Sequence, residues 1–455
     1  MFFKKIHSEG LAQLSYIVGD ANSAFVVDPR RDCEIYREIA DREGVQITHI
    51  FETHRNEDFV IGSCDLAAMT GATIYHGGRL DFHYGEITRE GDQFEFGAIQ
   101  VRVLETPGHT DESISLVLAD TDFSREPLAV FTGDALFIGD VGRTDFFPER
   151  AEEVAGLLYD SLFDKLLPLG DGVLIYPAHG AGSVCGSGMA TREFSSLGFE
   201  RRFNPALQVQ NKQEFIQKKV AEAHYTPPYF KQMEKFNLKG QPPLARLPRP
   251  RPLSPKQMSA EIEKGLLLLD TRSPEAYSGA SIPGSLAIPL EMIPAYAGWF
   301  LEPDQPIGLV VQQVSDVARA VRYLVRVGYE NVLGFLDEGL HAWEISGKSY
   351  QNIPSLYAGD LKKRLAQDHP PTLLDVRKQS EVDQGHLPGS LHIFLGELPT
   401  KQDQIPKDRP VVTFCGSGQR AIIAASILMR QGFTEVENCL GSMAACKVLG
   451  CRIVS

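Results

Sequence analysis

The sequence predicts an α/β protein built from several domains, and three observations support this fold class. The chain has 455 residues, which is enough for two to four domains of ordinary size. In its second half, short apolar runs alternate with helical patterns, as they do in parallel α/β sheets. That half also contains the same unit twice, which indicates a duplicated domain.

The composition is that of a globular protein with an acidic surface. Apolar residues make up 43% of the chain and charged residues 23%, and the net charge is −14. This charge argues against nucleic acid or an anionic membrane as the main partner. No apolar run approaches the roughly 18 residues needed to span a bilayer, and the first residues do not resemble a signal peptide. The seven cysteines match neither a zinc knuckle nor a disulfide framework, so we expect a cytoplasmic protein with mostly free thiols.

In the first half, three residues that can bind a metal follow apolar runs typical of buried strands. The residues are His54, His109 and Asp134. Side chains at three strand ends can converge on one edge of a sheet sandwich, so we expect a metal site there. The strands are expected at residues 47–53, 101–104 and 128–131.

The runs around these residues resemble the motifs of the metallo-β-lactamase superfamily. Residues 53–59 (THRNEDF) resemble its metal-binding loop T-H-x-H-x-D-H, and residues 106–110 (TPGHT), 132–137 (TGDALF) and 176–180 (YPAHG) resemble three further landmarks in the same order. The resemblance covers roughly residues 1–210. It implies an αββα sandwich with the metal site at one edge.

Two ligands of a dinuclear site in this superfamily are replaced here, by Asn56 and Phe59. A phenyl ring cannot coordinate a metal, so a two-metal hydrolytic site is hard to build. The two histidines and one aspartate that are left form the kind of triad that holds non-haem Fe(II) with open positions. The chain is most similar in this respect to the persulfide dioxygenases, which use one iron and carry the Gly-Arg-Thr-Asp run found here at residues 142–145. The resemblance therefore implies one Fe(II) per chain.

The resemblance suggests a role for Arg143, and the positions of three further residues close to the motifs suggest theirs. Arg143 would help to bind the thiol carrier through a carboxylate or phosphate fork, with a surface salt bridge as the alternative. Asp58 and His179 would lie beside the metal or face the substrate, and His179 has a structural role as its alternative. Cys185 would relay sulfur near the iron, unless it is a structural thiol.

In the second half, the repeated unit resembles a rhodanese domain. The run LLDTR at residues 268–272 returns as LLDVR at 373–377, and IPGSL at 282–286 returns as LPGSL at 387–391. Both offsets are 105 residues (373 − 268 and 387 − 282). The resemblance implies two α/β domains with parallel sheets.

Only the second copy has the cysteine that sulfur transfer requires. An expected strand at 410–414 ends at Cys415, and a Gly-rich loop leads to Arg420 at the start of a helix. Backbone N–H groups of such a loop form an anion nest, and the helix N-terminus and the arginine add positive potential that stabilises a thiolate. The segment resembles the rhodanese active-site loop, which implies that Cys415 accepts sulfane sulfur; a buried inert thiol is the alternative.

The first copy has no cysteine at all, because none occurs between Cys185 and Cys415. We expect it to be an inactive scaffold that serves packing, dimerisation or orientation of the active copy. A Pro/Arg-rich stretch marks the joint before it. The expected domains are a dioxygenase domain at 1–240, a linker at 241–252, an inactive rhodanese-like domain at 253–350 and an active one at 355–455.

These features predict a persulfide dioxygenase–rhodanese fusion with a role in sulfide detoxification. The iron domain would oxidise the persulfide of a small thiol, such as glutathione or coenzyme A, with O2 to sulfite. The rhodanese domain would move sulfane sulfur between thiosulfate, sulfite and the thiol through Cys415. We expect a homo-oligomer. Two alternatives stay open: a dinuclear-zinc thioester hydrolase of the glyoxalase II type, and a non-enzymatic sulfur carrier or redox sensor.

Overall fold

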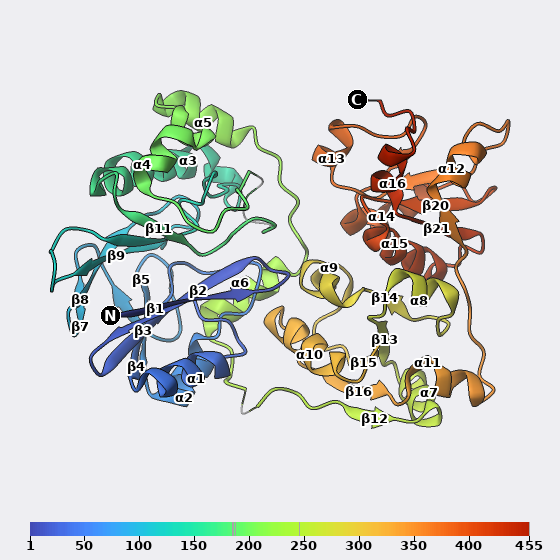
Figure 1. Cartoon of the computed structure of the whole chain (residues 1–455), viewed down its shortest axis with the longest axis horizontal. Coiled ribbons are helices and arrows are strands. Elements are labelled where there is room, and N and C mark those ends of the chain that lie inside the picture. Colours follow the sequence, from blue (N-terminus) through green and yellow to red (C-terminus); the bar gives the residue numbers. More distant parts are fainter. Residues whose placement is uncertain (184–185, 187, 245, 455) are drawn as a thin grey trace. The chain divides into compact units, whose positions relative to one another are not determined.

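The computed structural model describes residues 1–183, 186, 188–244 and 246–454, and the chain divides into two units (Figure 1). The first unit comprises Met1–Arg246 with Val325–Gly328. The second comprises Leu247–Leu324 and Tyr329–Ser455.

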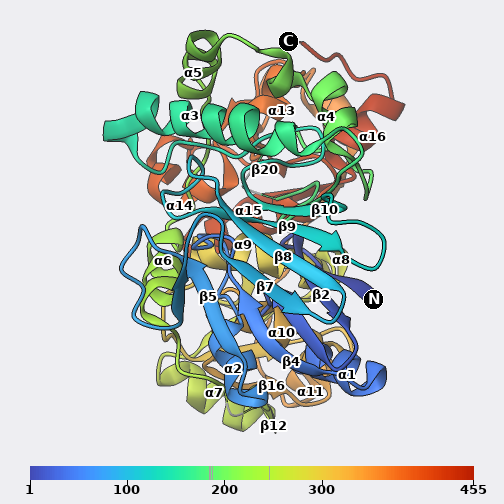
Figure 2. The same cartoon turned by 90° about the vertical axis from the view of Figure 1, so that its left-hand side faces the viewer.

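Two mixed sheets form the middle of the first unit (Figure 2). One has the order β1-β2-β3-β4-β5-β6. Strands β1, β2 and β3 pair antiparallel with one another, and the pairs β3–β4, β4–β5 and β5–β6 are parallel. The other has the order β11-β10-β9-β8-β7, with only β10 and β11 parallel. The strands are β1 (Phe2–Ser8), β2 (Gln13–Asp20), β3 (Ser23–Val27), β4 (Gln46–Phe51), β5 (Thr73–Gly77), β6 (Glu86–Thr88), β7 (Gln93–Phe96), β8 (Ile99–Glu105), β9 (Ile114–Asp120), β10 (Ala129–Gly133) and β11 (Leu174–Pro177).

Helices cover the outer faces of both sheets, which confirms the predicted αββα sandwich. Strand β3 shows why its sequence is almost wholly apolar: Val26 packs with Tyr36 of α1 on one face, and Phe25 packs with Phe131 of the other sheet on the opposite face. A third core joins β10 and β11 to α3 and α5. The helices of this unit are α1 (Glu34–Glu43), α2 (Ser63–Thr70), α3 (Ala151–Asp160), α4 (Leu197–Phe203), α5 (Lys212–Val220) and α6 (Phe230–Lys239).

The second unit contains two five-stranded sheets in which all pairs are parallel, as the repeat predicts. Their orders are β12-β16-β15-β13-β14 and β17-β21-β20-β18-β19, so each strand of the first sheet has a counterpart in the second. The strands are β12 (Arg251–Leu253), β13 (Leu267–Asp270), β14 (Leu286–Ala287), β15 (Ile307–Val310), β16 (Val332–Leu336), β17 (Ser355–Tyr357), β18 (Thr372–Asp375), β19 (Leu391–His392), β20 (Val411–Phe414) and β21 (Val436–Leu440).

The end of the predicted linker takes part in this fold. Arg251 and Pro252 begin β12, which lies at the edge of its sheet, where a proline costs no ladder hydrogen bond on the open side. The helices of the second unit are α7 (Pro255–Glu263), α8 (Pro274–Gly279), α9 (Ile293–Phe300), α10 (Asp316–Arg326), α11 (Gly339–Ile345), α12 (Ala358–Arg364), α13 (Gln379–Asp383), α14 (Leu398–Lys401), α15 (Gln419–Arg430) and α16 (Ser442–Val448).

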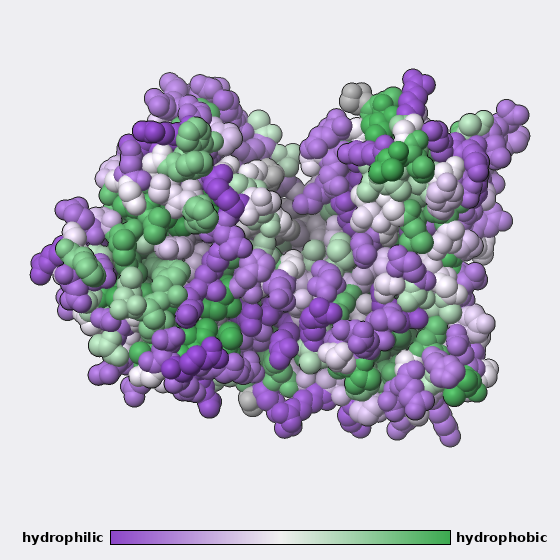
Figure 3. All heavy atoms as spheres, viewed as in Figure 1, coloured by the Kyte–Doolittle hydropathy of each residue, from purple (hydrophilic) through white to green (hydrophobic). Residues whose placement is uncertain are grey.

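The surface is mixed in polarity. On the face shown in Figure 3, polar side chains are interspersed with apolar ones. Among the helices of the described residues, none is both long enough and apolar enough to cross a membrane.

Candidate metal and sulfur-transfer sites

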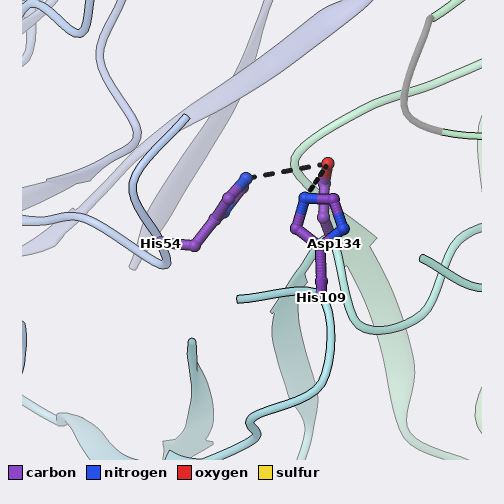
Figure 4. A group of neighbouring side chains, drawn as sticks. All are labelled: His54, His109 and Asp134. Carbon is purple, nitrogen blue, oxygen red and sulfur yellow. Dashed lines mark ion pairs between the residues drawn. The ribbon is translucent and has the colours of Figure 1, made fainter. Parts of the chain in front are cut away.

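Three strands from both sheets of the first unit bring His54, His109 and Asp134 together. His54 follows β4, His109 follows β8, and Asp134 comes directly after β10. All three side chains are buried, and one ligand atom from each lies within 4.8 Å of the others. Both imidazoles point at the same carboxylate oxygen, with Nε2 atoms of His54 and His109 at 3.6 and 3.5 Å from Asp134 Oδ2 (Figure 4).

Hydrogen bonds at Nδ1 fix the tautomer of both histidines. Thr53 Oγ1 donates to Asp28 at 2.7 Å, so its lone pair is left to accept from His54 Nδ1 at 2.9 Å. The carbonyl of Arg143 can only accept, so His109 Nδ1 donates to it at 3.0 Å. Each ring therefore turns an unprotonated Nε2 to the site, which is the arrangement common in metal-binding histidines.

The charges at this site fit a divalent cation. Burial lowers the pKa of His54 to about 3 and also lowers the pKa of His109, so both rings are neutral near pH 7. Burial alone would raise the pKa of Asp134, but the surrounding histidines, His179 first, hold it below its usual value. Neither Nε2 has a hydrogen-bond partner among the described residues. Two neutral imidazoles and one carboxylate are a donor set that suits a divalent metal ion.

Asp58, His179 and Phe59 lie beside the triad. His179 Nδ1 lies 2.8 Å from Asp134 Oδ1, and His179 Nε2 lies 3.2 Å from Asp58 Oδ2. Phe59 is fully buried, and its ring stands edge-on to His179 with 6.0 Å between ring centroids. Asp58 and His179 thus lie beside the triad and orient its aspartate, and a phenyl ring fills the space next to them.

Two glycines allow the loops of this site to approach closely. A Cβ atom on Gly142 would lie 2.1 Å from the carbonyl oxygen of Asp134. Gly133 has φ +53°, a left-handed conformation, and a Cβ there would lie 2.8 Å from the side chain of Thr53. Side chains at these positions would push Asp134 away from the histidines.

Arg143 is buried, so the surface salt bridge considered above does not describe its setting. Its guanidinium makes a two-pronged ion pair with Asp145, at 2.6 Å from both oxygens, and lies over the ring of Phe146 at 4.8 Å. Its carbonyl receives the hydrogen bond from His109. The observed contacts of Arg143 are therefore structural, and its contact with a thiol carrier stays a prediction.

Helix α6 supplies a residue that the sequence did not single out. Asn237 is buried, and its Nδ2 donates to the carbonyls of Asn56 at 2.6 Å and of Phe59 at 2.8 Å. Its Oδ1 accepts from the backbone N–H of Ile61 at 3.0 Å. One side chain thus satisfies two backbone groups of the metal-binding loop and a third just after it. The sequence holds no local signal for this contact, because Asn237 lies more than 170 residues from its partners.

The loop after β20 has the geometry of a sulfur-binding site. Cys415 is buried, its Sγ accepts from the backbone N–H of Gly418 at 3.1 Å, and its own N–H donates to Ser442 Oγ at 3.1 Å. Gly418 has φ +102° and precedes α15, so the turn into the helix favours glycine. The N-terminus of α15 therefore faces the thiol, as expected from the sequence.

Arg420 is held in place by a residue that was not predicted. Its guanidinium forms a bidentate ion pair with Glu381, with Nη1–Oε2 at 2.6 Å and Nη2–Oε1 at 2.8 Å. Burial would raise the pKa of Glu381, but the hydrogen bonds from Arg420 lower it. Glu381 also lines a cavity of about 270 Å³ beside the cysteine loop, together with Arg377, Gly416, Met443, Ala444 and Lys447.

The cysteine-less copy contributes to the surroundings of this loop within the second unit. Tyr296 of α9 is buried and interacts with the guanidinium of Arg420, and burial raises the pKa of its phenol to about 12. Nearby, Trp299 stands edge-on to Phe394 with ring centroids 5.4 Å apart. The loop of the first copy that corresponds to the Cys415 loop begins at Val311 and carries no thiol.

The other cysteines have no comparable setting. Burial raises the pKa of both Cys439 and Cys446 to about 12, as expected for inert thiols. Cys185, the predicted sulfur relay, lies outside the described residues.

Comparisons with known proteins agree with this arrangement. Residues 9–179 match the family model of the metallo-beta-lactamase superfamily, and residues 254–346 and 357–448 each match that of the rhodanese-like domain. The chain is 30% identical over 214 residues to mouse "Persulfide dioxygenase ETHE1, mitochondrial", which covers 44% of this chain and 74% of the relative. It is 38% identical over 95 residues to a "Sulfurtransferase" of Allochromatium vinosum, which covers 21% of this chain and 89% of the relative.

A solved structure described as a metallo-beta-lactamase from Staphylococcus aureus covers more of the chain. It superposes with a TM-score of 0.67 at 33% identity, over 74% of this chain and 98% of the other. The chain therefore belongs to the persulfide dioxygenase family of the metallo-β-lactamase superfamily, with two rhodanese-like domains after the metallo-β-lactamase domain.

Proposed function

We propose that the first unit is an iron-dependent persulfide dioxygenase that converts the persulfide of a small thiol to sulfite and free thiol. The observation that carries this proposal is the compact group of His54, His109 and Asp134, with Phe59 in the place of a ligand to a second metal. One iron per chain would supply the activation of O2. The name of the mouse relative, a persulfide dioxygenase, supports the same substrate class.

The residues of the chain would hold and shape this site. Thr53 and the carbonyl of Arg143 keep both imidazoles in the tautomer that presents Nε2, and His179 keeps Asp134 turned towards them. The burial of the triad excludes bulk water from the persulfide, which limits its hydrolysis and side reactions. Glutathione and coenzyme A are the carriers we propose, with Arg143 as a candidate contact.

In the second unit, Cys415 would transfer sulfane sulfur. Its thiolate attacks the outer sulfur of thiosulfate, an S–S bond forms, and sulfite leaves with the electron pair of the broken bond. An acceptor thiolate then takes the same sulfur from the Cys415 persulfide and regenerates the cysteine thiolate. The N–H of Gly418 and the helix N-terminus stabilise the anion in both states. The reverse direction makes thiosulfate from sulfite, so the product of one site is a substrate of the other.

One preparation tests this proposal against its two rivals. Anaerobically purified chain should hold close to one iron and consume O2 with a thiol persulfide, whereas a glyoxalase II type hydrolase would hold two zinc ions and cleave thioesters. A sulfur carrier or sensor would transfer sulfur without O2 uptake. Metal analysis together with an oxygen electrode separates the three, and a metal-free chain that consumes no O2 contradicts the dioxygenase.

A further inference from the structure

A buried carboxylate next to the triad has one oxygen without a protein partner. Glu57 is fully buried in the metal-binding loop. Its Oε1 accepts from Arg55 Nη2 at 3.3 Å, but its Oε2 has no hydrogen-bond donor among the described residues. That Oε2 lies 3.8 Å from His109 Nε2, the atom that His109 presents to the metal site.

The neighbouring charges do not compensate this oxygen. Arg55 is the cation beside Glu57, but its Nη2 also lies 3.6 Å from Glu234 Oε2. The backbone N–H of Arg55 donates to Glu112. A buried carboxylate oxygen without a donor is costly, and a buried charge is ordinarily paired or bound to a metal. The uncompensated oxygen therefore calls for a cation that the protein itself does not provide.

A neutral Glu57 does not resolve this. A protonated carboxyl is the rival state. Its hydrogen atom would then need an acceptor, and His109 Nε2 at 3.8 Å is beyond hydrogen-bond range. In either protonation state the Oε2 atom has no hydrogen-bond partner among the described residues, and it lies 3.8 Å from His109 Nε2.

We propose that Glu57 is a fourth protein ligand of the ion held by His54, His109 and Asp134. This rests on the metal of the proposed function. Neighbouring ligands of an octahedral ion with bonds of about 2.1 Å stand roughly 3 Å apart. The triad atoms, at 3.5 and 3.6 Å, have to close by about half an ångström around such an ion, and the 3.8 Å between Glu57 Oε2 and His109 Nε2 has to close by about 0.8 Å.

A fourth ligand has a chemical consequence. Six-coordinate iron with three protein ligands keeps three open positions, whereas with four it keeps two. Two positions match the two reactants, the terminal sulfur of the persulfide and O2. Two carboxylates would also balance the charge of Fe(II) itself.

The test uses the whole chain with glutamate labelled in its carboxyl carbon by ¹³C. The triad contains no glutamate, so the isotope-edited part of an infrared difference spectrum, Fe(II) form minus apo form, reports glutamate carboxylates that change on metal binding and excludes Asp134. We expect one glutamate carboxylate band to shift on anaerobic addition of Fe(II). The same band should be absent in Glu57→Gln. The band shift is measured on the wild-type chain. It can therefore be established even if the Glu57→Gln chain does not fold.

A second measurement compares Fe(II) affinity by anaerobic competition with a chelator. Glu57→Gln should raise the dissociation constant at least about tenfold, the scale of loss for groups that support a metal. Glu234→Gln is the matched control, because it removes the same charge beside Arg55 without facing His109; it should change the constant less than threefold. Thiosulfate sulfur transfer through Cys415 checks that each variant chain is folded.

The outcomes separate this inference from the proposed function. If the wild-type chain binds one iron and oxidises persulfide, but no glutamate band moves and Glu57→Gln binds iron as wild type does, the ligand assignment is wrong and the dioxygenase stands. If the wild-type chain binds no iron and takes up no O2, both fail.

Discussion

Replacement of Asn237 by alanine should loosen the metal-binding loop without touching the metal site directly. The variant loses three hydrogen bonds, of 2.6, 2.8 and 3.0 Å, between helix α6 and the backbone of the loop. Each is worth on the order of 1 kcal/mol net, so local opening should become easier by about 3 kcal/mol. Because every 1.4 kcal/mol is a factor of ten, this corresponds to roughly a hundredfold increase in the open population.

Hydrogen exchange followed by mass spectrometry measures this opening. The amide of Ile61 donates to Asn237 Oδ1 and should exchange roughly a hundredfold faster in Asn237→Ala, since exchange of a protected amide follows its opening free energy. Asn237→Asp is the sharper variant: it keeps an acceptor for Ile61 but sets a buried carboxylate against the carbonyls of Asn56 and Phe59. It should be at least as damaging to the loop.

The control is Asn211→Ala. Asn211 is an exposed asparagine in the same unit whose Oδ1 accepts one backbone hydrogen bond, from Glu214 at 3.0 Å at the start of α5. This change should fray α5 and leave the exchange of Ile61 unchanged. If Asn237→Ala exchanges at Ile61 within threefold of wild type, the helix does not hold the loop and the reasoning is refuted.

Four further outcomes follow from the two sites. His109→Ala should lose both iron and persulfide-dependent O2 uptake, measured by metal analysis and an oxygen electrode. The zinc-loaded chain should not hydrolyse S-lactoylglutathione at enzymatic rates, and efficient turnover would favour the hydrolase. Cys415→Ser should abolish thiosulfate:thiol sulfur transfer but leave initial O2 uptake largely intact; equal loss of both would contradict separate sites. At pH 8, alkylation of Cys439 and Cys446 should be very slow, because with pKa values of about 12 only about one thiol in ten thousand is ionised.

The parts of the sites that the sequence predicted are those fixed by strand ends. His54, His109 and Asp134 each follow an apolar run, and the paired strands bring the runs together, so the triad could be anticipated from local patterns. The same holds for Cys415, whose position between a strand and a glycine-rich turn is encoded within ten residues.

The supporting residues could not be predicted, because their partners lie far away in the sequence. Asn237 holds a loop near residue 60, and Glu381 reaches Arg420 across 39 positions. Each is an ordinary polar residue on a helix, and nothing local distinguishes it from a solvated one. Only the packing of α6 and α13 shows that these side chains are used. Glu57 differs from these residues because it lies within the metal-binding loop that the sequence identified. Its burial could not be predicted from the sequence.

Phe59 has two effects at this site: its side chain offers no metal ligand, and its ring is packed in the interior. A polar residue at this position would remove the donor but leave space for water beside Asp58 and His179. The phenyl ring is fully buried and stands edge-on to His179, so it fills that space as well. Its burial contributes on the order of 2 kcal/mol, and a second ion would have to displace it. If the site holds a single metal ion, as we propose, this packing would maintain it together with the absence of a nitrogen ligand at position 59.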